Sequence, residues 1–372
     1  MKENSFVKST SEVPSENIYK KEAFNPENAS EYSFNLIKDF SDFFKEKGYV
    51  KKEAVSICSG IDPTVRFIGS HISVLKPFLE NEEITSPGIY MDQECIRTKN
   101  IKDLYNDGKF PNWGSYFISL GVLSPAERLP EACGDSFEFF QKKLNINVAL
   151  LKVRVSSTDN DLLQVCQEVF PEETIEKDSK PLPYYRHKIG MENVAGRNFN
   201  IALKNCEDDE FNDIGNIIIL EKGDKQVGVE LAFGVSTILK QQYNLEHVLD
   251  CTPVKGIESE YPDIKRKFED SIVTSSKLFS EGLRPLGSHN RNRLLKSYVR
   301  SLSYFRAKTG MPLNKLQEVI SNFNSKNKYI NQDDGSLIVE FVHAFENDLL
   351  VKGANTEEEY KILAAMKLNK NI

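Results

Sequence analysis

The first apolar pattern in the chain predicts an amphipathic helix over residues 34–47. Apolar side chains recur there at spacings of three and four residues, which places them on one helical face. Gly48 comes next and is a common helix terminator, because glycine adopts a left-handed backbone conformation at little cost. Residues 1–31, before this helix, are polar and predict a disordered tail. The positions on the apolar face are Phe34, Ile37, Phe40, Phe43 and Phe44.

Short runs of β-branched and apolar residues predict a mixed region of strands and loops after this helix. The clearest signal is a hairpin over residues 215–234, in which two apolar strands flank the turn Lys-Gly-Asp-Lys at 222–225. Residues 182–205 contain spaced glycines and have a composition typical of turns. The other predicted strands lie at 56–60, 64–69, 88–91, 115–123 and 148–157, and the predicted helices lie at 134–146 and 235–244.

Strand signals stop near residue 253, and every later apolar run has helical periodicity. This change predicts an α+β fold with two domains, one over residues 32–253 and an all-α domain over residues 254–372. The helices predicted in the second domain span 265–282, 291–310, 313–324 and 337–353.

The composition narrows the class of protein. The chain has 372 residues, of which 40% are hydrophobic and 28% are charged, as is typical of globular proteins. No apolar run reaches the roughly 18 residues of a membrane span, and the N-terminus lacks the apolar segment of a secretory signal. We therefore expect a cytoplasmic protein without a membrane partner. The net charge of −7 argues against general affinity for DNA, although it permits a local basic face.

The cysteines give no sign of a metal site. Six cysteines are scattered singly, without the paired spacing of zinc ligands. We therefore expect free thiols, no zinc and no metal-binding residues.

Six segments carry a pattern that extends across both predicted domains. They read DPTVRFIGSHISVLKPFLEN, QECIRTKNIKDL, IGMENVAGRNFNI, DIGNIII, VGVELAFGVSTIL and EGLRPLGSHNRNRLLKSYVRSLSYFRAKTG. In this order they resemble the core of alanyl-tRNA synthetase, a class II aminoacyl-tRNA synthetase, from about Phe34 to Gly353. The resemblance implies a class II synthetase-like antiparallel sheet flanked by helices, followed by helices that recognise tRNA.

The resemblance also implies an adenylation site. In the family, an amino-acid carboxylate joins the α-phosphate of ATP, usually with Mg²⁺, so fixed cations must face that phosphate. Arg97 matches the arginine that holds the phosphate, and a guanidinium suits this role because it is planar, permanently charged and bidentate. Arg66 is a second cation expected at the ATP site. The alternative for Arg97 is an ordinary surface arginine on a hairpin.

An amino-acid pocket is implied by four further positions. Glu230 takes the place of the family aspartate that pairs with the substrate ammonium, and Asn216 matches the asparagine that orients the amino acid. His187 takes the place of a tryptophan in the pocket wall, and Gly234 belongs to the same segment as Glu230. The alternatives are an exposed strand glutamate, an asparagine bonded to backbone and a plain loop histidine. We expect a structural role for His71.

Two departures from the family pattern bear on activity. Thr237 replaces the family arginine that binds the γ-phosphate and the adenine, and Ile118 replaces a glutamate in the second half of the phosphate-binding motif. Removing a charged partner of this kind costs roughly 2–5 kcal/mol. Lys188, Arg197 and Arg66 are the cations near the implied site that could substitute for the lost arginine.

Basic residues recur along the predicted helix at 291–310. A basic stripe on an acidic protein favours contact with RNA phosphates, here a tRNA acceptor stem, and its alternative is a solvated helix face. The residues are Arg291, Arg293, Lys296, Arg300, Arg306 and Lys308.

These patterns favour two functions. The first is ATP-dependent activation of a small amino acid, with Mg²⁺, and its transfer to tRNA or another acceptor. The second is a catalytically inactive or repurposed paralogue that binds tRNA or aminoacyl-tRNA, with a place in specialised metabolism. A protein-interaction module on the same fold is a third function, which no motif specifically favours. No segment resembles the family's editing or C-terminal oligomerisation domain, so we expect no correction of mischarged products by these residues.

Overall fold

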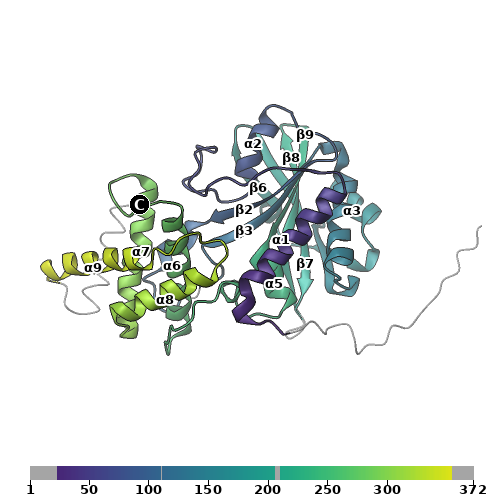
Figure 1. Cartoon of the computed structure of the whole chain (residues 1–372). Coiled ribbons are helices and arrows are strands. Elements are labelled where there is room, and N and C mark those ends of the chain that lie inside the picture. Colours follow the sequence, from purple (N-terminus) through teal and green to yellow (C-terminus); the bar gives the residue numbers. More distant parts are fainter. Residues whose placement is uncertain (1–22, 110, 206–209, 354–372) are drawn as a thin grey trace, which may run out of the picture.

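The computed structural model describes residues 23–109, 111–205 and 210–353. Within these residues the strands form one mixed sheet of nine strands, with the order β1-β2-β3-β9-β8-β7-β4-β5 and with β6 paired to β7 (Figure 1). The β1–β2 and β4–β5 pairs are parallel and the other pairs are antiparallel. The strands are β1 Val50–Lys51, β2 Ile89–Ile96, β3 Tyr116–Ser124, β4 Leu151–Ser156, β5 Ile175–Asp178, β6 Arg186–Met191, β7 Val194–Lys204, β8 Phe211–Lys222 and β9 Lys225–Gly234.

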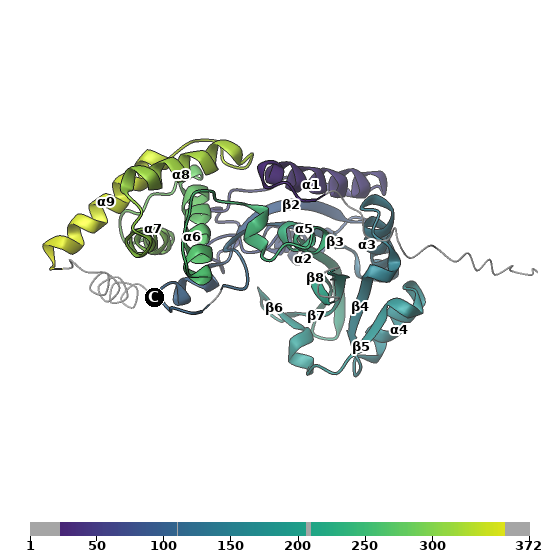
Figure 2. The same ribbon diagram turned by 90° about the horizontal axis from the view of Figure 1, so that it is seen from below.

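Helices cover the sheet and continue beyond it. Helices α1, α3 and α5 pack on the sheet, and α6–α9 lie together beside the end of the sheet where β2 stops and β3 begins (Figure 2). This arrangement confirms the predicted α+β class, with an antiparallel sheet followed by a helical region. The helices are α1 Ala29–Glu46, α2 Ile72–Glu80, α3 Leu129–Glu138, α4 Asn160–Val169, α5 Val235–Gln242, α6 Pro262–Ser280, α7 Asn290–Thr309, α8 Leu313–Lys326 and α9 Gly335–Val351.

Successive side chains of the central strands point to opposite faces of the sheet, and each face has its own apolar core. Ile118, Leu120 and Val122 of β3 face the larger core, which also contains apolar residues of α1, α3 and α5. Side chains of the opposite parity face a smaller core under α2, where Leu75 packs near Met91. The candidate site lies on this second face, because Phe117 and Ser119 have the same parity.

The predicted hairpin is confirmed. Strands β8 and β9 pair from Lys222 and Lys225 at the turn, and Gly223 adopts a φ of +62°. A left-handed conformation at this position is what a tight two-residue turn requires, and glycine accepts it without a steric penalty.

The two predicted strands at 56–60 and 64–69 are wrong, because these residues form a loop. Their apolar character reflects burial, since Ile57 is fully buried in the core. The Gln93 side-chain amide bonds both the N–H and the carbonyl of Val55, each at 2.9 Å, so a side chain takes the place of a neighbouring strand.

The prediction of turns over residues 182–205 is also wrong, because β6 and β7 occupy most of this range. Only Glu192 and Asn193 separate the two strands, and Asn193 has a φ of +59°. Asparagine tolerates this conformation better than most residues, so the turn needs no glycine.

The first helix begins earlier than predicted, at Ala29, and Phe34 on its expected apolar face is 48% exposed. Residues 1–22 of the predicted tail lie outside the described residues. The remaining part, residues 23–31, includes a short 3-10 turn at Pro26–Asn28 and the start of α1.

A buried carboxylate joins the helical region to the sheet. Asp270 of α6 accepts hydrogen bonds from the Ser115 N–H at 2.6 Å and from the Ser115 hydroxyl at 2.7 Å, immediately before β3. Tyr298 of α7 donates to the same Ser115 hydroxyl at 2.9 Å.

The domain boundary near residue 253 stays a prediction. No helix of the described residues has both the length and the apolar character needed to cross a membrane.

Candidate functional site

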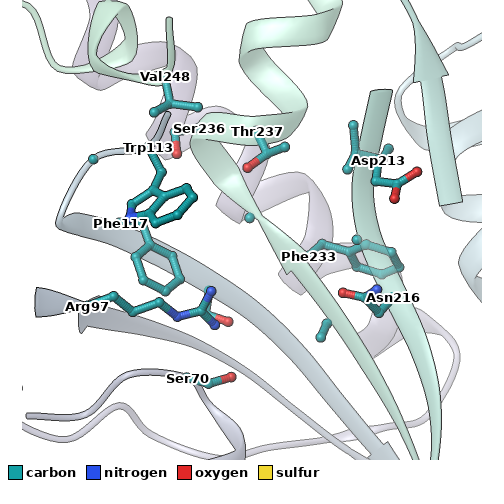
Figure 3. Close-up of a pocket in the computed structure, with 16 residues that line it drawn as sticks. Ser70, Arg97, Trp113, Phe117, Asp213, Asn216, Phe233, Ser236, Thr237 and Val248 are labelled. Atoms are coloured by element: carbon teal, nitrogen blue, oxygen red, sulfur yellow. The ribbon is translucent and has the colours of Figure 1, made fainter. Parts of the chain in front are cut away.

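A cavity of about 240 Å³ lies on the second face of the sheet, and Figure 3 shows its walls. Arg97 and Phe117 stand on one wall and Asn216 on the opposite wall, while Thr237 lies at the start of α5. The structure therefore brings together Arg97, Asn216, Gly234 and Thr237, which the sequence assigned to one site.

Arg97 is held in place from two sides. It follows the end of β2, and its Nε donates to the Gly69 carbonyl at 2.9 Å. Its guanidinium carbon lies 4.7 Å from the centre of the Phe117 ring, a cation–π contact. Arg97 is exposed to solvent, although desolvation by neighbouring groups lowers the pKa of its guanidinium, and none of the described carboxylates forms an ion pair with it. A fixed guanidinium without an acidic partner is suited to bind an anion in the cavity.

Asn216 belongs to a ladder of amides on neighbouring strands. Its Nδ2 donates to Asn200 Oδ1 at 2.6 Å, and Asn198 Nδ2 donates to the same oxygen at 2.6 Å. Asn200 in turn donates to Asp213 at 2.7 Å, and Arg154 pairs with Asp213 at 3.0 Å. The ladder fixes the Asn216 side chain at the cavity wall. Asn198 Oδ1 is buried and has no hydrogen-bond partner.

Glu230 of β9 is almost completely buried and does not line the cavity. Its Oε1 lies 3.0 Å from His71 Nε2, while its Oε2 is buried without a hydrogen-bond partner. His71 Nδ1 lies 2.8 Å from the hydroxyl of Ser119, which lines the cavity. His71 was expected to have a structural role only, and the structure places its ring between Ser119 and Glu230. Sequence reasoning did not single out Ser119, because an isolated strand serine carries no local signal.

His187 lies on β6 opposite Gly196 and does not line the cavity. Its Nε2 is buried without a hydrogen-bond partner. Burial lowers the pKa of His187, and the nearby Glu230 carboxylate and Asn198 amide act in the opposite direction. The His187 imidazole is therefore close enough to Glu230 and Asn198 for both to affect its pKa.

Ile118 was expected to take a glutamate's place in the phosphate clamp, but it points away from Arg97. Adjacent residues of a strand face opposite sides of a sheet, so Phe117 faces the guanidinium and Ile118 enters the main core. Ile118 therefore does not fill the space of a nucleotide beside Arg97.

None of the three candidate substitute cations lines the cavity. Arg197 pairs with Asp159 and Asp161, each at 2.6 Å. Arg66 and Lys188 are exposed and lie outside the cavity wall. Among the described residues that form this wall, Arg97 is the one cationic side chain.

The predicted basic stripe is divided between internal contacts. Arg291 donates to three backbone carbonyls, those of Cys58, Ser59 and Arg66, of which Ser59 accepts at 2.8 Å. Arg306 pairs with Glu346 at 2.7 Å. Lys308 pairs with Asp107 at 2.9 Å, and Arg300 lies 5.3 Å from the centre of the Phe345 ring. Lys296 donates to the Gly287 carbonyl, and Arg293 donates to the Asn290 side chain.

The cavity wall offers little to a metal ion. Among the described residues, no group of three His, Cys, Asp or Glu side chains could hold one. Asp213 is the carboxylate of the wall, and Arg154, Asn200 and Tyr184 already engage its oxygens. The residues therefore do not fit a magnesium ion held by the protein itself.

The comparisons with known proteins identify relatives of one kind. No protein-family model matches the chain. An alanine–tRNA ligase of Acetivibrio thermocellus is 24% identical over 320 residues, which cover 76% of this chain and 36% of that protein. An alanine–tRNA ligase of Bacillus velezensis is 31% identical over 142 residues, 37% of this chain and 16% of that protein. The chain thus spans well under half the length of these relatives.

Solved structures with a similar fold are also tRNA synthetases. A histidyl-tRNA synthetase of S. aureus has a TM-score of 0.39 and 9% identity, over 67% of this chain and 75% of that chain. A pyrrolysyl tRNA synthetase of Desulfitobacterium hafniense has a TM-score of 0.36 and 11% identity, over 62% of this chain and 74% of that chain. The resemblance predicted from the sequence is confirmed, and the chain is a divergent homologue of alanine–tRNA ligases.

Proposed function

We propose that this protein activates the carboxylate of a small amino acid with ATP and passes the resulting aminoacyl group to tRNA or another acceptor. The observation that carries the proposal is Arg97, a guanidinium on the wall of a cavity that is held by the Gly69 carbonyl and the Phe117 ring and has no described carboxylate partner. Negative charge builds up on the α-phosphate as the adenylate forms. A cation already fixed in place stabilises that charge without reorganising.

The substrate ammonium is assigned to the buried acceptors beside Glu230. Glu230 Oε2 and Asn198 Oδ1 are both buried without hydrogen-bond partners, and both accept hydrogen bonds. An unpaired buried carboxylate oxygen is costly, and an ammonium group offsets this cost.

The proposed reaction assigns no protein-bound magnesium ion to the cavity. The relatives' reaction uses ATP, and any ion that accompanies the nucleotide would be held through its phosphates, because the described cavity wall lacks a free carboxylate. The cytoplasm is the proposed location, since both ATP and tRNA are present there.

The test is ATP–pyrophosphate exchange with the full chain and each of the twenty amino acids. We expect exchange with a small amino acid such as alanine, glycine or serine. Absence of exchange with every amino acid, in protein shown to be folded by circular dichroism, contradicts the proposal.

The single cation of the cavity wall favours a second candidate function. With Thr237 in place of an arginine, the γ-phosphate of ATP has no described cationic partner in the cavity. A protein of this kind would bind aminoacyl-tRNA or a preformed adenylate without turning over ATP. Retention of aminoacylated tRNA at low salt, without pyrophosphate exchange, would support it, and loss of retention at higher salt would mark phosphate contacts.

A further inference from the structure

Three polar side chains from different elements form a buried line that ends at the cavity. Ser119 comes from β3, His71 from the residue before α2 and Glu230 from β9. The Ser119 Oγ lies 2.8 Å from His71 Nδ1 in a hydrogen bond, and His71 Nε2 lies 3.0 Å from Glu230 Oε1 in a close contact that lacks hydrogen-bond geometry. We propose that Ser119 is a nucleophile that accepts an acyl group from an activated carbonyl, with His71 as its base and Glu230 as the group that orients His71.

The hydrogen bond between Ser119 and His71 determines which tautomer of the imidazole suits a base. When His71 carries its proton on Nε2, the nitrogen that faces Glu230, Nδ1 is an acceptor and receives the hydrogen bond of the Ser119 hydroxyl. This is the pairing of nucleophile and base that activates a serine, with a carboxylate beside the second ring nitrogen and with the two nitrogens in exchanged roles.

The line is rigid because its surroundings leave no room for other positions. His71 is fully buried, and a Cβ atom at Gly121 would lie 2.0 Å from its Cδ2. The absence of a side chain at Gly121 is therefore what admits the imidazole beside β3. Only Ser119 of the line also borders the cavity, where it shares the wall with Arg97. A carbonyl in this cavity has a nucleophile on one side and a fixed positive charge near the developing oxyanion.

The substrate class is an acyl group activated as an ester or a mixed anhydride with phosphate. Ser119 Oγ attacks the carbonyl carbon while its proton moves to His71 Nδ1. The bond between that carbon and the leaving oxygen then breaks, the electron pair departs with the phosphate or alcohol, and an ester on Ser119 remains. The protonated His71 gives its proton to a departing alcohol oxygen, or to solvent when phosphate departs, and is neutral again. It then takes the proton of an incoming alcohol, thiol or amine as that group attacks the ester carbonyl, and it passes this proton to Ser119 Oγ as the ester is cleaved.

The aminoacyl-adenylate as acyl donor rests on the proposed function, but the reactivity of Ser119 does not. The first experiment therefore uses a fluorophosphonate probe on the full chain without ATP or amino acid. We expect one covalent addition with loss of fluoride, located at Ser119 by peptide mass spectrometry. Ser119→Ala should abolish the addition, and His71→Gln should slow it at least 10-fold.

Ser325→Ala is the control, because Ser325 is an exposed serine of α8 that does not line the cavity. It should be labelled at the wild-type rate. Should His71→Gln fail to fold, Glu230→Gln tests the same dependence. An unlabelled wild-type protein, or equal labelling of Ser119→Ala, overturns the proposal.

A second experiment separates this proposal from the function of the whole site. The protein is incubated with ATP and radioactive alanine, glycine or serine, and an ester on Ser119 is detected by its release with hydroxylamine. Probe labelling without an aminoacyl ester supports the nucleophile while contradicting ATP-dependent activation as its source of acyl groups. Pyrophosphate exchange without probe labelling supports ATP-dependent activation and contradicts the assignment of Ser119 as a nucleophile.

Discussion

The side chain of Arg97 shows how one residue can be prepared for an anion. Arg97 is exposed to solvent, but the Gly69 carbonyl and the Phe117 ring hold its guanidinium in one position at the cavity. None of the described carboxylates pairs with it, so its charge is available to a ligand. A charged group that is already oriented binds an anion without a cost of ordering the side chain, and its position determines where the charge of that ligand lies.

We expect Arg97→Lys to lower the rate of pyrophosphate exchange roughly 100-fold or more, because a lysine is a single flexible point charge without the bidentate geometry. The Nε bond to Gly69 is also lost. Exchange kinetics at saturating ATP measure this effect. Arg66→Lys is the control, since Arg66 lies outside the cavity and should keep its rate. Equal losses in both variants would contradict the assignment of Arg97.

Gly121→Ala should displace His71 and disturb Ser119 without removing any polar group. A methyl group at this position overlaps the imidazole, and overpacking of this kind costs about 1–3 kcal/mol. We expect a lower free energy of unfolding in urea and slower labelling of Ser119 by a fluorophosphonate. Gly108→Ala is a glycine control, because a Cβ atom there would point into open space, although its φ of +76° adds backbone strain. It should lower stability and leave labelling unchanged.

The predicted site residues that share the cavity are those that a local motif identified. Arg97 and Asn216 share a cavity because their motifs place each at a particular point on its strand. Ile118 was assigned to the clamp from its motif alone, although strand parity turns it into the core. The contact of His71 with Ser119 joins residues 48 positions apart, and no short motif encodes such a pairing.

The elements show the same division between local and long-range signals. The β8–β9 hairpin and the helices after residue 253 follow from periodicity and turn chemistry within a few residues. The loop over residues 52–69 does not, because its backbone is satisfied by the Gln93 side chain and by Arg291 from α7. Apolar runs in this loop resemble strands, since burial and strand formation select the same residue types.

Arg291 is expected to act as a brace of α7 on this loop. Its guanidinium donates to three backbone carbonyls, and hydrogen bonds of charged groups contribute about 1.5–3 kcal/mol in favourable cases. Arg291→Ala should therefore lower the free energy of unfolding by about 1–3 kcal/mol. Arg293→Ala, two residues further along α7 and bonded to exposed Asn290, should change it by less than about 0.5 kcal/mol. Urea unfolding measures both.

The same pair of variants tests the role of α7 in tRNA binding. A surface that contacts phosphates would lose affinity in Arg293→Ala, with a shallower salt dependence. Loss of affinity in Arg291→Ala alone would follow from the weakened brace instead. Equal stability of the two variants would contradict the bracing contacts.

The molecule as a whole joins its sheet, cavity and helical region through buried polar groups. Asp270 ties α6 to the start of β3, and His247 ties the segment after α5 to the loop that carries Trp113. Nε2 of His247 donates to the Pro111 carbonyl at 2.7 Å, and Nδ1 accepts from the Leu249 N–H at 3.1 Å. The imidazole is therefore neutral in the folded protein, because its second nitrogen has no room for a proton.

This neutral histidine makes the stability of the fold depend on pH. Burial lowers the pKa of His247 below its usual value of 6.5, and the charges of Arg266 and Lys240 act in the same direction. The hydrogen bond to the Pro111 carbonyl and the charge of Asp250 act against this lowering without reversing it. Below about pH 6.5 the unfolded chain binds a proton that the folded chain excludes, so the free energy of unfolding falls as the pH falls. His187, whose pKa burial also lowers, contributes in the same sense.

Buried acidic side chains change the free energy of unfolding with pH in the opposite direction, so their effect must be separated from that of His247. Burial raises the pKa of Asp92, Glu269 and Asp270, so these groups favour the folded state as the pH falls. The comparison that isolates His247 is the change in unfolding free energy between pH 7.5 and pH 5.5, measured in urea for the wild type and for His247→Gln. We expect the loss at low pH to be smaller in the variant, while the exposed His343→Gln control keeps the wild-type loss. Identical pH dependence in all three proteins would show that the neutral imidazole is not what the fold requires at this joint.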